Sequence, residues 1–285
     1  MTGVDAVLSG NVLRLDGSDS DRWMPDVLEH DPFPPYWWLR GVDGKERQAL
    51  LQRDLENALR AGGSLLFGYF DPVKRIGGLL QAVRLDWDSR LFRKDLWSIN
   101  HLGAWTGVAA ERPLICSSLV KECQGALSEE KADGLLARVP IDNLSAVNAL
   151  EGSGFRTVEV SSTWLFDFRD SIPPKRNPDW IRDSRAGDEG RLIELASERY
   201  SAIPDRFHVD SMFGDEAGNE LYAAWMKNCC CGEQADFISV AEHDGKVLGY
   251  ATVKDRGDEG GLLRCRIGQL GLGAMLPEYS SRGLV

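Results

Sequence analysis

A cluster of prolines divides this chain into two parts. Pro173, Pro174 and Pro178 fall within six residues. Proline lacks a backbone N–H and restricts the residue before it, so neither a helix nor a strand continues through such a cluster. The chain has 285 residues, more than a single hydrophobic core usually organises. We therefore predict an amino-terminal domain at 1–172, a linker at 173–179 and a carboxy-terminal domain at 180–285.

Both parts combine helix-like and strand-like patterns, which predicts the α/β class with mixed sheets. Before the linker, the patterns predict helices at 46–61, 117–127 and 143–150, and strands at 64–70, 76–83, 134–139 and 156–168. After it, they predict a strand at 180–185, helices from Asp188 to Tyr200 and over 219–230, a hairpin at 236–253 that turns at Asp244-Gly245, and a strand at 264–272. The two orders are similar enough to suggest two copies of one fold.

The composition argues against several classes of partner. A formal charge of −11 disfavours nucleic acid, because affinity for a phosphate backbone rests on clustered Lys and Arg. Apolar runs such as 65–70 are too short to span a membrane. The six cysteines lack disulfide-type spacing and predict reduced thiols in the cytoplasm. The run Cys229-Cys230-Cys231 cannot close on one metal ion, since consecutive helical side chains diverge by about 100°, and no metal is expected.

The last residues suggest an anion site. The strand predicted at 264–272 leads into a turn at 277–285 that contains Gly283. Glycine lets the backbone approach a phosphate closely, and Arg282 can add a charge-assisted contact. Backbone N–H groups at a following helix start favour an anion as well. The alternative is an ordinary surface turn.

Several segments together resemble a known family, the GNAT N-acetyltransferase superfamily. The segments are Leu85-Asp-Trp-Asp-Ser-Arg-Leu-Phe92, Ala137-Arg-Val-Pro140, Asn143 to Phe155, Arg206-Phe-His-Val-Asp210 and Glu220-Leu-Tyr-Ala-Ala-Trp225. They resemble most closely the tandem dTDP-fucosamine acetyltransferase branch, over about 84–285. This resemblance implies two GNAT-like units, the second of them incomplete at Val285.

The resemblance also implies a cofactor site for acetyl-CoA as co-substrate. In this family two strands splay apart, and the pantetheine arm pairs with the exposed strand groups. The residues implied to bind the cofactor are Leu270, Gly271 and Leu272 on the strand, and Ser281, Arg282, Gly283, Leu284 and Val285 on the pyrophosphate turn. The turn departs from the family pattern, because Ser280 replaces Gln or Arg and Val285 replaces a small residue.

The acceptor implied by the resemblance is a primary amine, with a nucleotide-linked amino sugar as the best guess. Arg206, His208 and Asp210 are implied to bind it; the alternative is a polar loop with local hydrogen bonds. The family's general acid, a tyrosine, is expected beyond Val285. In the first unit the matching position is Leu150, so this unit is predicted to be structural.

Two alternatives remain open. The chain could have this fold and act on another small amine or on a protein N-terminus, or it could be a non-catalytic binding protein. Because a half-domain exposes a sheet edge and apolar surface, we expect it to pair with another chain, for example as a homodimer.

Overall fold

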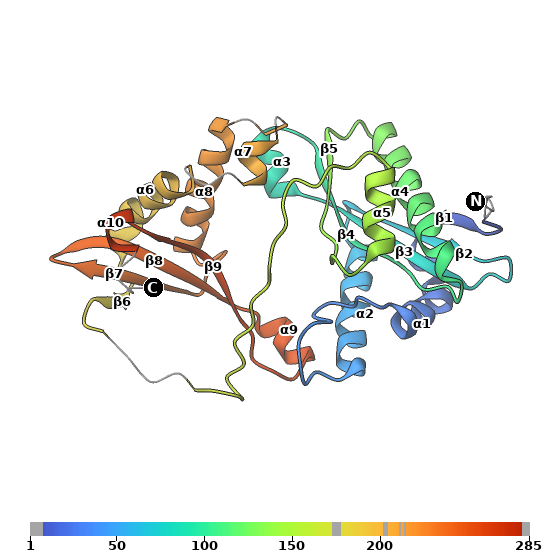
Figure 1. The fold of residues 1–285 in the computed structure, drawn as a ribbon, viewed down its shortest axis with the longest axis horizontal. Coiled ribbons are helices and arrows are strands. Elements are labelled where there is room, and N and C mark those ends of the chain that lie inside the picture. The colour runs from blue at the N-terminus through green and yellow to red at the C-terminus, as the bar shows by residue number, and fades with distance from the viewer. Residues whose placement is uncertain (1–7, 173–177, 202–204, 211, 214, 281–285) are drawn as a thin grey trace, which may run out of the picture. The chain divides into compact units, whose positions relative to one another are not determined.

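The computed structural model describes residues 8–172, 178–201, 205–210, 212–213 and 215–280. It divides the chain into two compact units (Figure 1). Unit 1 comprises 1–157 with 262–264, and unit 2 comprises 158–261 with 265–285. Each unit has its own β-sheet with helices packed on it, so the predicted α/β class is confirmed. The division falls ahead of the proline cluster, of which residues 173–177 lie outside the described part.

Unit 1 is built on a mixed sheet in the order β1-β2-β3-β4-β5. Neighbouring strands are antiparallel except β4 and β5, which are parallel. Its strands are β1 (Asn11–Arg14), β2 (Ser64–Phe70), β3 (Ile76–Arg84), β4 (Leu96–Ala104) and β5 (Gly134–Ala137). Its helices are α1 (Ser20–His30), α2 (Gly44–Arg60), α3 (Asp86–Phe92), α4 (Arg112–Glu129) and α5 (Leu144–Gly152).

Alternation along the strands supplies a core on each face of this sheet. On β2, Leu65 and Phe67 pack with α4 and α5, whereas Leu66 packs with α1 and α2. Successive strand side chains point to opposite faces, which explains the near-continuous apolar run of β2. The four helices thus cover the sheet on both sides, and α4 and α5 lie next to each other (Figure 1).

Unit 2 is built on an antiparallel sheet in the order β6-β7-β8-β9. Its strands are β6 (Ile181–Asp183), β7 (Phe237–His243), β8 (Lys246–Asp255) and β9 (Gly268–Met275). Its helices are α6 (Glu189–Tyr200), α7 (Arg206–Val209), α8 (Asp215–Cys230), α9 (Gly257–Leu262) and α10 (Pro277–Ser280). The hairpin predicted at Asp244-Gly245 is confirmed, and both turn residues have positive φ, 49° and 71°.

The strand predicted at 264–272 begins later than expected. Arg264 has a φ of 51°, and the N–H of Cys265 donates to the carbonyl of Gly260 at the end of α9. The extra helix and its turn therefore displace the strand, which runs as β9 from Gly268 to Met275. Leu270, Gly271 and Leu272 still fall within it.

An ion-pair network anchors the start of unit 2. Arg182 on β6 donates to both carboxylate oxygens of Asp188, at 2.6 and 2.9 Å, and its Nε donates to Glu242 on β7 at 2.6 Å. Asp188 occupies the N-cap position of α6, as the sequence predicts, but its side chain is used by Arg182 and by the N–H of Arg185. The carboxylate thus joins the sheet to the helix.

The two units repeat one order of elements. Each runs strand, helix, helix, strand, strand, short helix, strand, with α3 and α9 as the short helices; unit 2 has the four-residue α7 in addition, between α6 and α8. In each unit the fourth strand also has one residue more than the third strand over the stretch where the two pair, which is a β-bulge. In unit 1 Gln81 pairs with His101 and Ala82 with Ile99, so Asn100 is the extra residue. A shared order with a bulge at the same place supports two copies of one topology.

The strand predicted at 156–168 is wrong. These residues are described, and they pair with no strand of the described chain. Their apolar side chains do alternate, but they point to solvent, and Trp164 is 91% exposed. The others of this series are Val158, Val160, Phe166 and Phe168. Alternation fixes which residues share a face, whereas a strand also needs a partner edge.

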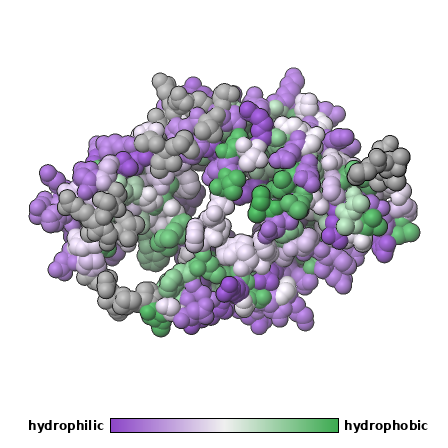
Figure 2. Space-filling view, in the orientation of Figure 1, coloured by the Kyte–Doolittle hydropathy of each residue, from purple (hydrophilic) through white to green (hydrophobic). Residues whose placement is uncertain are grey.

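Hydrophilic residues predominate on the face of the molecule shown in Figure 2.

Candidate active site

The candidate site is centred on the outer edge of β9, the edge turned away from β8. Among the described strands β9 pairs with β8 alone. An edge strand presents backbone N–H and C=O groups that need partners. At Gly273 both groups bond the same side chain: the N–H donates to the Tyr200 hydroxyl at 3.2 Å, and this hydroxyl lies 3.1 Å from the carbonyl oxygen. The last residue of α6 therefore covers the edge at Gly273.

A bulge shapes β9 next to this point. Ala251 pairs with Gly273 and Val253 with Leu270, so β9 has one residue more than β8 over this stretch. Thr252 faces the bulge, and its hydroxyl donates to the carbonyl of Leu272 at 3.0 Å. A Cβ at Gly271 would lie 2.7 Å from this hydroxyl oxygen, so a side chain there requires a shift. Gly271 and Thr252 together hold the bulge.

A cluster of polar side chains surrounds Asp205, which caps α7. Its carboxylate accepts hydrogen bonds from the N–H groups of Phe207 and His208, at 2.9 and 3.2 Å. His208 Nδ1 lies 2.8 Å from the same oxygen, and the Tyr222 hydroxyl donates to the other. A Cβ at Gly218 would lie 2.8 Å from His208 Nε2, so this glycine lets the imidazole pack against α8.

The contacts within the cluster shift the pKa values of Asp205 and Tyr222. Burial raises the pKa of Asp205, but hydrogen bonds from Tyr222, His208 and the backbone of Phe207 outweigh it, so the pKa is lowered overall. Burial, and then the bond to Asp205, raises the pKa of Tyr222. Burial also raises the pKa of Tyr200 and of Tyr250. The carboxylate stays ionised and the three phenols stay neutral near pH 7.

Stacked rings join this cluster to the β9 edge. Tyr200 and Tyr222 stack with centroids 4.1 Å apart and planes 10° apart, and Trp225 continues the stack at 6.2 Å from Tyr222. The buried hydroxyl of Tyr250, on β8, has no hydrogen-bond partner within the described part of the chain. Neutral hydroxyls, an imidazole and a carboxylate thus lie along one route from Asp205 to Gly273. Such groups can donate to a carbonyl and accept a proton from an amine.

The predicted site residues fall into three groups. Leu270, Gly271 and Leu272 lie on β9 around the bulge, whereas 281–285, with Ser281, Arg282, Gly283, Leu284 and Val285, lie outside the described residues. Of the predicted acceptor residues, His208 belongs to the Asp205 cluster. Arg206 pairs with Glu159 at 3.1 Å and stacks over Phe207, and Asp210 accepts from the N–H of Met212.

Three residues around Asp205 were not predicted from the sequence as site residues, and neither was Gly273, which lies just beyond the predicted strand. Tyr200 ends the helix that the sequence predicts from Asp188, and Tyr222 lies in the helix predicted over 219–230, so the pattern indicates only helical positions for both. Asp205 could have been predicted as a helix cap from the sequence, because aspartate is a preferred N-cap residue. That preference indicates a cap and gives no hint of the bond to Tyr222, which is 17 residues away.

In unit 1 the matching edge is closed. β4 pairs with β5 from Leu96 to Ile99. Beyond this stretch, the side chain of Asn143 donates to the carbonyl of Leu102 at 2.9 Å while capping α5. Leu150 packs in the core. Unit 1 thus satisfies this carbonyl internally.

Comparisons with known proteins give one curated relative at low identity. No family model matches the chain. The chain is 25% identical over 195 residues to the spore coat polysaccharide biosynthesis protein SpsD of Bacillus subtilis (strain 168), a match that covers 67% of the chain and 63% of that protein. The chain therefore spans less than two thirds of the relative's length.

Similar solved structures include two aminoglycoside acetyltransferases. The enzyme from Acinetobacter baumannii is 11% identical with a TM-score of 0.39, over 55% of this chain and 98% of that one. The enzyme from a soil metagenomic sample is 14% identical with a TM-score of 0.41, over 56% and 96%. A transcriptional regulator from Bacillus halodurans C-125 is 14% identical with a TM-score of 0.40, over 55% and 99%. Likeness at this level carries no conclusion about activity.

Within the described residues, no helix combines the length and apolar character needed to cross a membrane.

The Asp205 cluster leads to a prediction about stability. Asp205→Asn is expected to lower the free energy of unfolding near pH 7 by about 1.5–3 kcal/mol, because it removes a charged hydrogen-bond acceptor. Since folding lowers the pKa of Asp205, its stabilisation is complete above the ordinary value of 3.8 and is lost as the pH falls below it. Urea unfolding at several pH values measures the difference, which is expected to shrink in acid.

The exposed Asp258 in α9 provides the control. Asp258→Asn is expected to leave the urea midpoint nearly unchanged. Equal losses in both variants, or a loss at Asp205 that does not depend on pH, would contradict the role given to the cluster.

Proposed function

We propose that this chain is an acetyl-CoA-dependent N-acetyltransferase that acts on the primary amine of a nucleotide-linked amino sugar. The observation that carries the proposal is the bulged outer edge of β9, where Gly273 offers a backbone N–H to a side-chain hydroxyl. A cofactor arm that contains amide groups can pair with such an edge as a peptide strand does. The thioester carbonyl would then replace the Tyr200 hydroxyl at Gly273.

The transfer is a direct attack. The neutral amine attacks the thioester carbonyl carbon, the C–N bond forms, and the C–S bond breaks. The N–H of Gly273 stabilises the negative charge that develops on the carbonyl oxygen. The nitrogen loses a proton, for which His208, held by Asp205, is the proposed acceptor. Tyr200, neutral because burial raises its pKa, is the proposed donor of a proton to the departing thiolate.

The acceptor assignment rests on the resemblance and on the curated relative, whose name refers to polysaccharide biosynthesis. We propose that Arg206, His208 and Asp210 border the acceptor, with Arg206 near a phosphate. Leu270, Gly271 and Leu272 would contact the cofactor arm, and Ser281 to Val285 its pyrophosphate. The six cysteines have free thiols, which is in keeping with the cytoplasm as the proposed location.

A matched pair of variants at Gly273 tests the function. Gly273→Pro removes the backbone N–H, and an edge strand tolerates proline where that group is not used in pairing. It is expected to lower kcat by about 10²–10³-fold, as loss of one such donor does elsewhere. Gly273→Ala keeps the N–H, and its Cβ would lie at an ordinary 3.6 Å from the Tyr250 carbonyl oxygen, so it is expected to retain most activity.

The assay measures release of free thiol from acetyl-CoA with a nucleotide amino sugar, and circular dichroism checks that both variants fold. An aminoglycoside and a polyamine serve as alternative acceptors. Turnover with one of these alone would replace the proposed acceptor and keep the reaction. Equal activity of the two Gly273 variants would contradict the assigned donor.

A second candidate is a non-catalytic binding protein. The observation that favours it is the Tyr200 hydroxyl itself, which already satisfies Gly273. Calorimetry separates the two candidates, because an enzyme must bind acetyl-CoA. If the wild-type chain binds no acetyl-CoA even at about millimolar concentration, at which weak binding is still detected, the second candidate is supported.

We further propose that the chain pairs with a second copy through the exposed residues of 158–168. Trp164→Ser combined with Phe168→Ser is expected to raise the monomer fraction, because both side chains are exposed apolar surface. Light scattering over a concentration series measures this fraction. Val73→Ser, at a 69% exposed position in unit 1, is the control and is expected to change nothing. A wild-type chain that is monomeric throughout would contradict the pairing.

A further inference from the structure

Two adjoining depressions lie on unit 1, where β3 ends and β4 begins. Their volumes are about 490 and 430 Å³, and Arg84, Asp86 and Asp95 line both. The first also contains Arg14 and Trp97. The second is bordered by α3 and the turn after it. Neither depression belongs to the β9 site of unit 2.

The second depression is rich in positive charge. It is lined by Arg84, Arg90, Arg93 and Lys94, against the two carboxylates Asp86 and Asp95, which leaves a formal charge of +2. The whole chain carries −11. An acidic protein repels anions in general, so a local excess of cations marks a place where one can bind.

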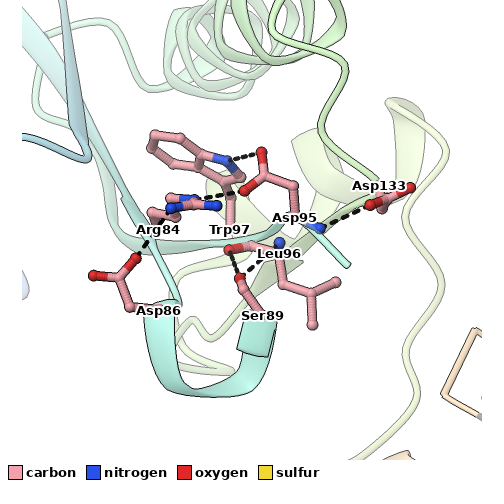
Figure 3. Close-up of polar contacts among 7 residues, drawn as sticks. All are labelled: Arg84, Asp86, Ser89, Asp95, Leu96, Trp97 and Asp133. Carbon is pink, nitrogen blue, oxygen red and sulfur yellow. Dashed lines mark hydrogen bonds and ion pairs between the residues drawn. The ribbon is translucent and has the colours of Figure 1, made fainter. Parts of the chain in front are cut away.

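The carboxylates of Asp86 and Asp95 already interact with neighbouring side chains. Figure 3 shows Arg84 between them: its Nε donates to Asp95 at 2.5 Å, and its Nη1 lies 3.4 Å from Asp86. Asp95 also accepts from the indole N–H of Trp97 at 3.1 Å. The hydrogen bond and charge of Arg84 lower the pKa of Asp95, so it stays ionised. The acids therefore neutralise Arg84.

The other three cations remain unpaired. The side chains of Arg90, Arg93 and Lys94 form no hydrogen bond or ion pair with any described residue. Guanidinium groups bind phosphate oxygens through paired N–H donors, and an ammonium adds a point charge. Three such groups around one depression suit an anion that has several oxygens.

The backbone beneath these cations is fixed. Ser89, which is 8% exposed, accepts a hydrogen bond from the N–H of Leu96 at 3.0 Å and lies 3.4 Å from its carbonyl oxygen (Figure 3). The N–H of Asp95 donates to Asp133 at 2.7 Å. α3 is thereby held against the start of β4, so the loop that bears Arg93 and Lys94 does not have to be ordered when a ligand binds. Preorganisation of this kind reduces the cost of binding.

We propose that this depression binds the phosphate or pyrophosphate group of a phosphorylated small molecule. The adjoining first depression, which is also lined by Arg14 and Glu130, would take the rest of the molecule. Unit 1, which has a closed edge at β4, thereby gains a binding role of its own. The inference does not depend on the transferase proposal, because it uses residues of unit 1 alone.

Calorimetry of the full chain with inorganic pyrophosphate at low salt tests the proposal. Arg90→Ala combined with Arg93→Ala is expected to weaken binding by at least about tenfold, since each charged hydrogen bond contributes that order. The control is Lys45→Ala combined with Lys121→Ala, which removes the same charge from other exposed positions of unit 1. It is expected to change the affinity less than about twofold through screened, long-range charge alone.

A second measurement needs no variant. Pyrophosphate is expected to protect Lys94 of the wild-type chain from acylation by an amine-reactive reagent, while Lys121 stays reactive; mass spectrometry measures both. Absence of pyrophosphate binding at about millimolar concentration, equal weakening in the two double variants, or unprotected Lys94 would each overturn the proposal.

Discussion

The candidate site of unit 2 depends on one interaction, the contact of the Tyr200 hydroxyl with both backbone groups of Gly273. An unpaired N–H or C=O at a sheet edge needs a partner, and here one side chain serves both. The same hydroxyl belongs to a ring stacked on Tyr222, which bonds Asp205. The edge of β9 is therefore connected to the cap of α7 through two tyrosines. A ligand that displaces the Tyr200 hydroxyl from Gly273 would therefore alter the contacts of Tyr222 and Asp205 as well.

The two units share one topology but differ in what covers the edge of the fourth strand. Both fourth strands contain a bulge, which changes the direction of the strand and the groups it presents. In unit 1, β5 and the side chain of Asn143 occupy the adjoining edge of β4. In unit 2, the corresponding edge of β9 meets a hydroxyl from α6. The difference lies in what covers the edge, which is why the proposed transfer is assigned to unit 2; the anion site proposed for unit 1 rests instead on the cations beside α3.

The sequence predicted the fold well wherever local rules decide it. The Asp244-Gly245 turn fixed the hairpin of β7 and β8, and nearly continuous apolar runs predicted β2 and β3. Two of the predicted strands were wrong in whole or in part. Residues 156–168 have the right alternation but pair with no strand of the described part of the chain, and the turn at Arg264 delays β9. The site shows the same division: β9 was found from its pattern, whereas the contact of Tyr200 with Gly273 joins residues 73 positions apart.

Amide hydrogen exchange with and without acetyl-CoA tests the central claim most directly. The account predicts that acetyl-CoA slows exchange in β9, residues 268–275, because the cofactor arm pairs with its outer edge. It also predicts faster exchange or altered protection at the end of α6, where Tyr200 is released. Binding of acetyl-CoA without any change in β9 would contradict the account.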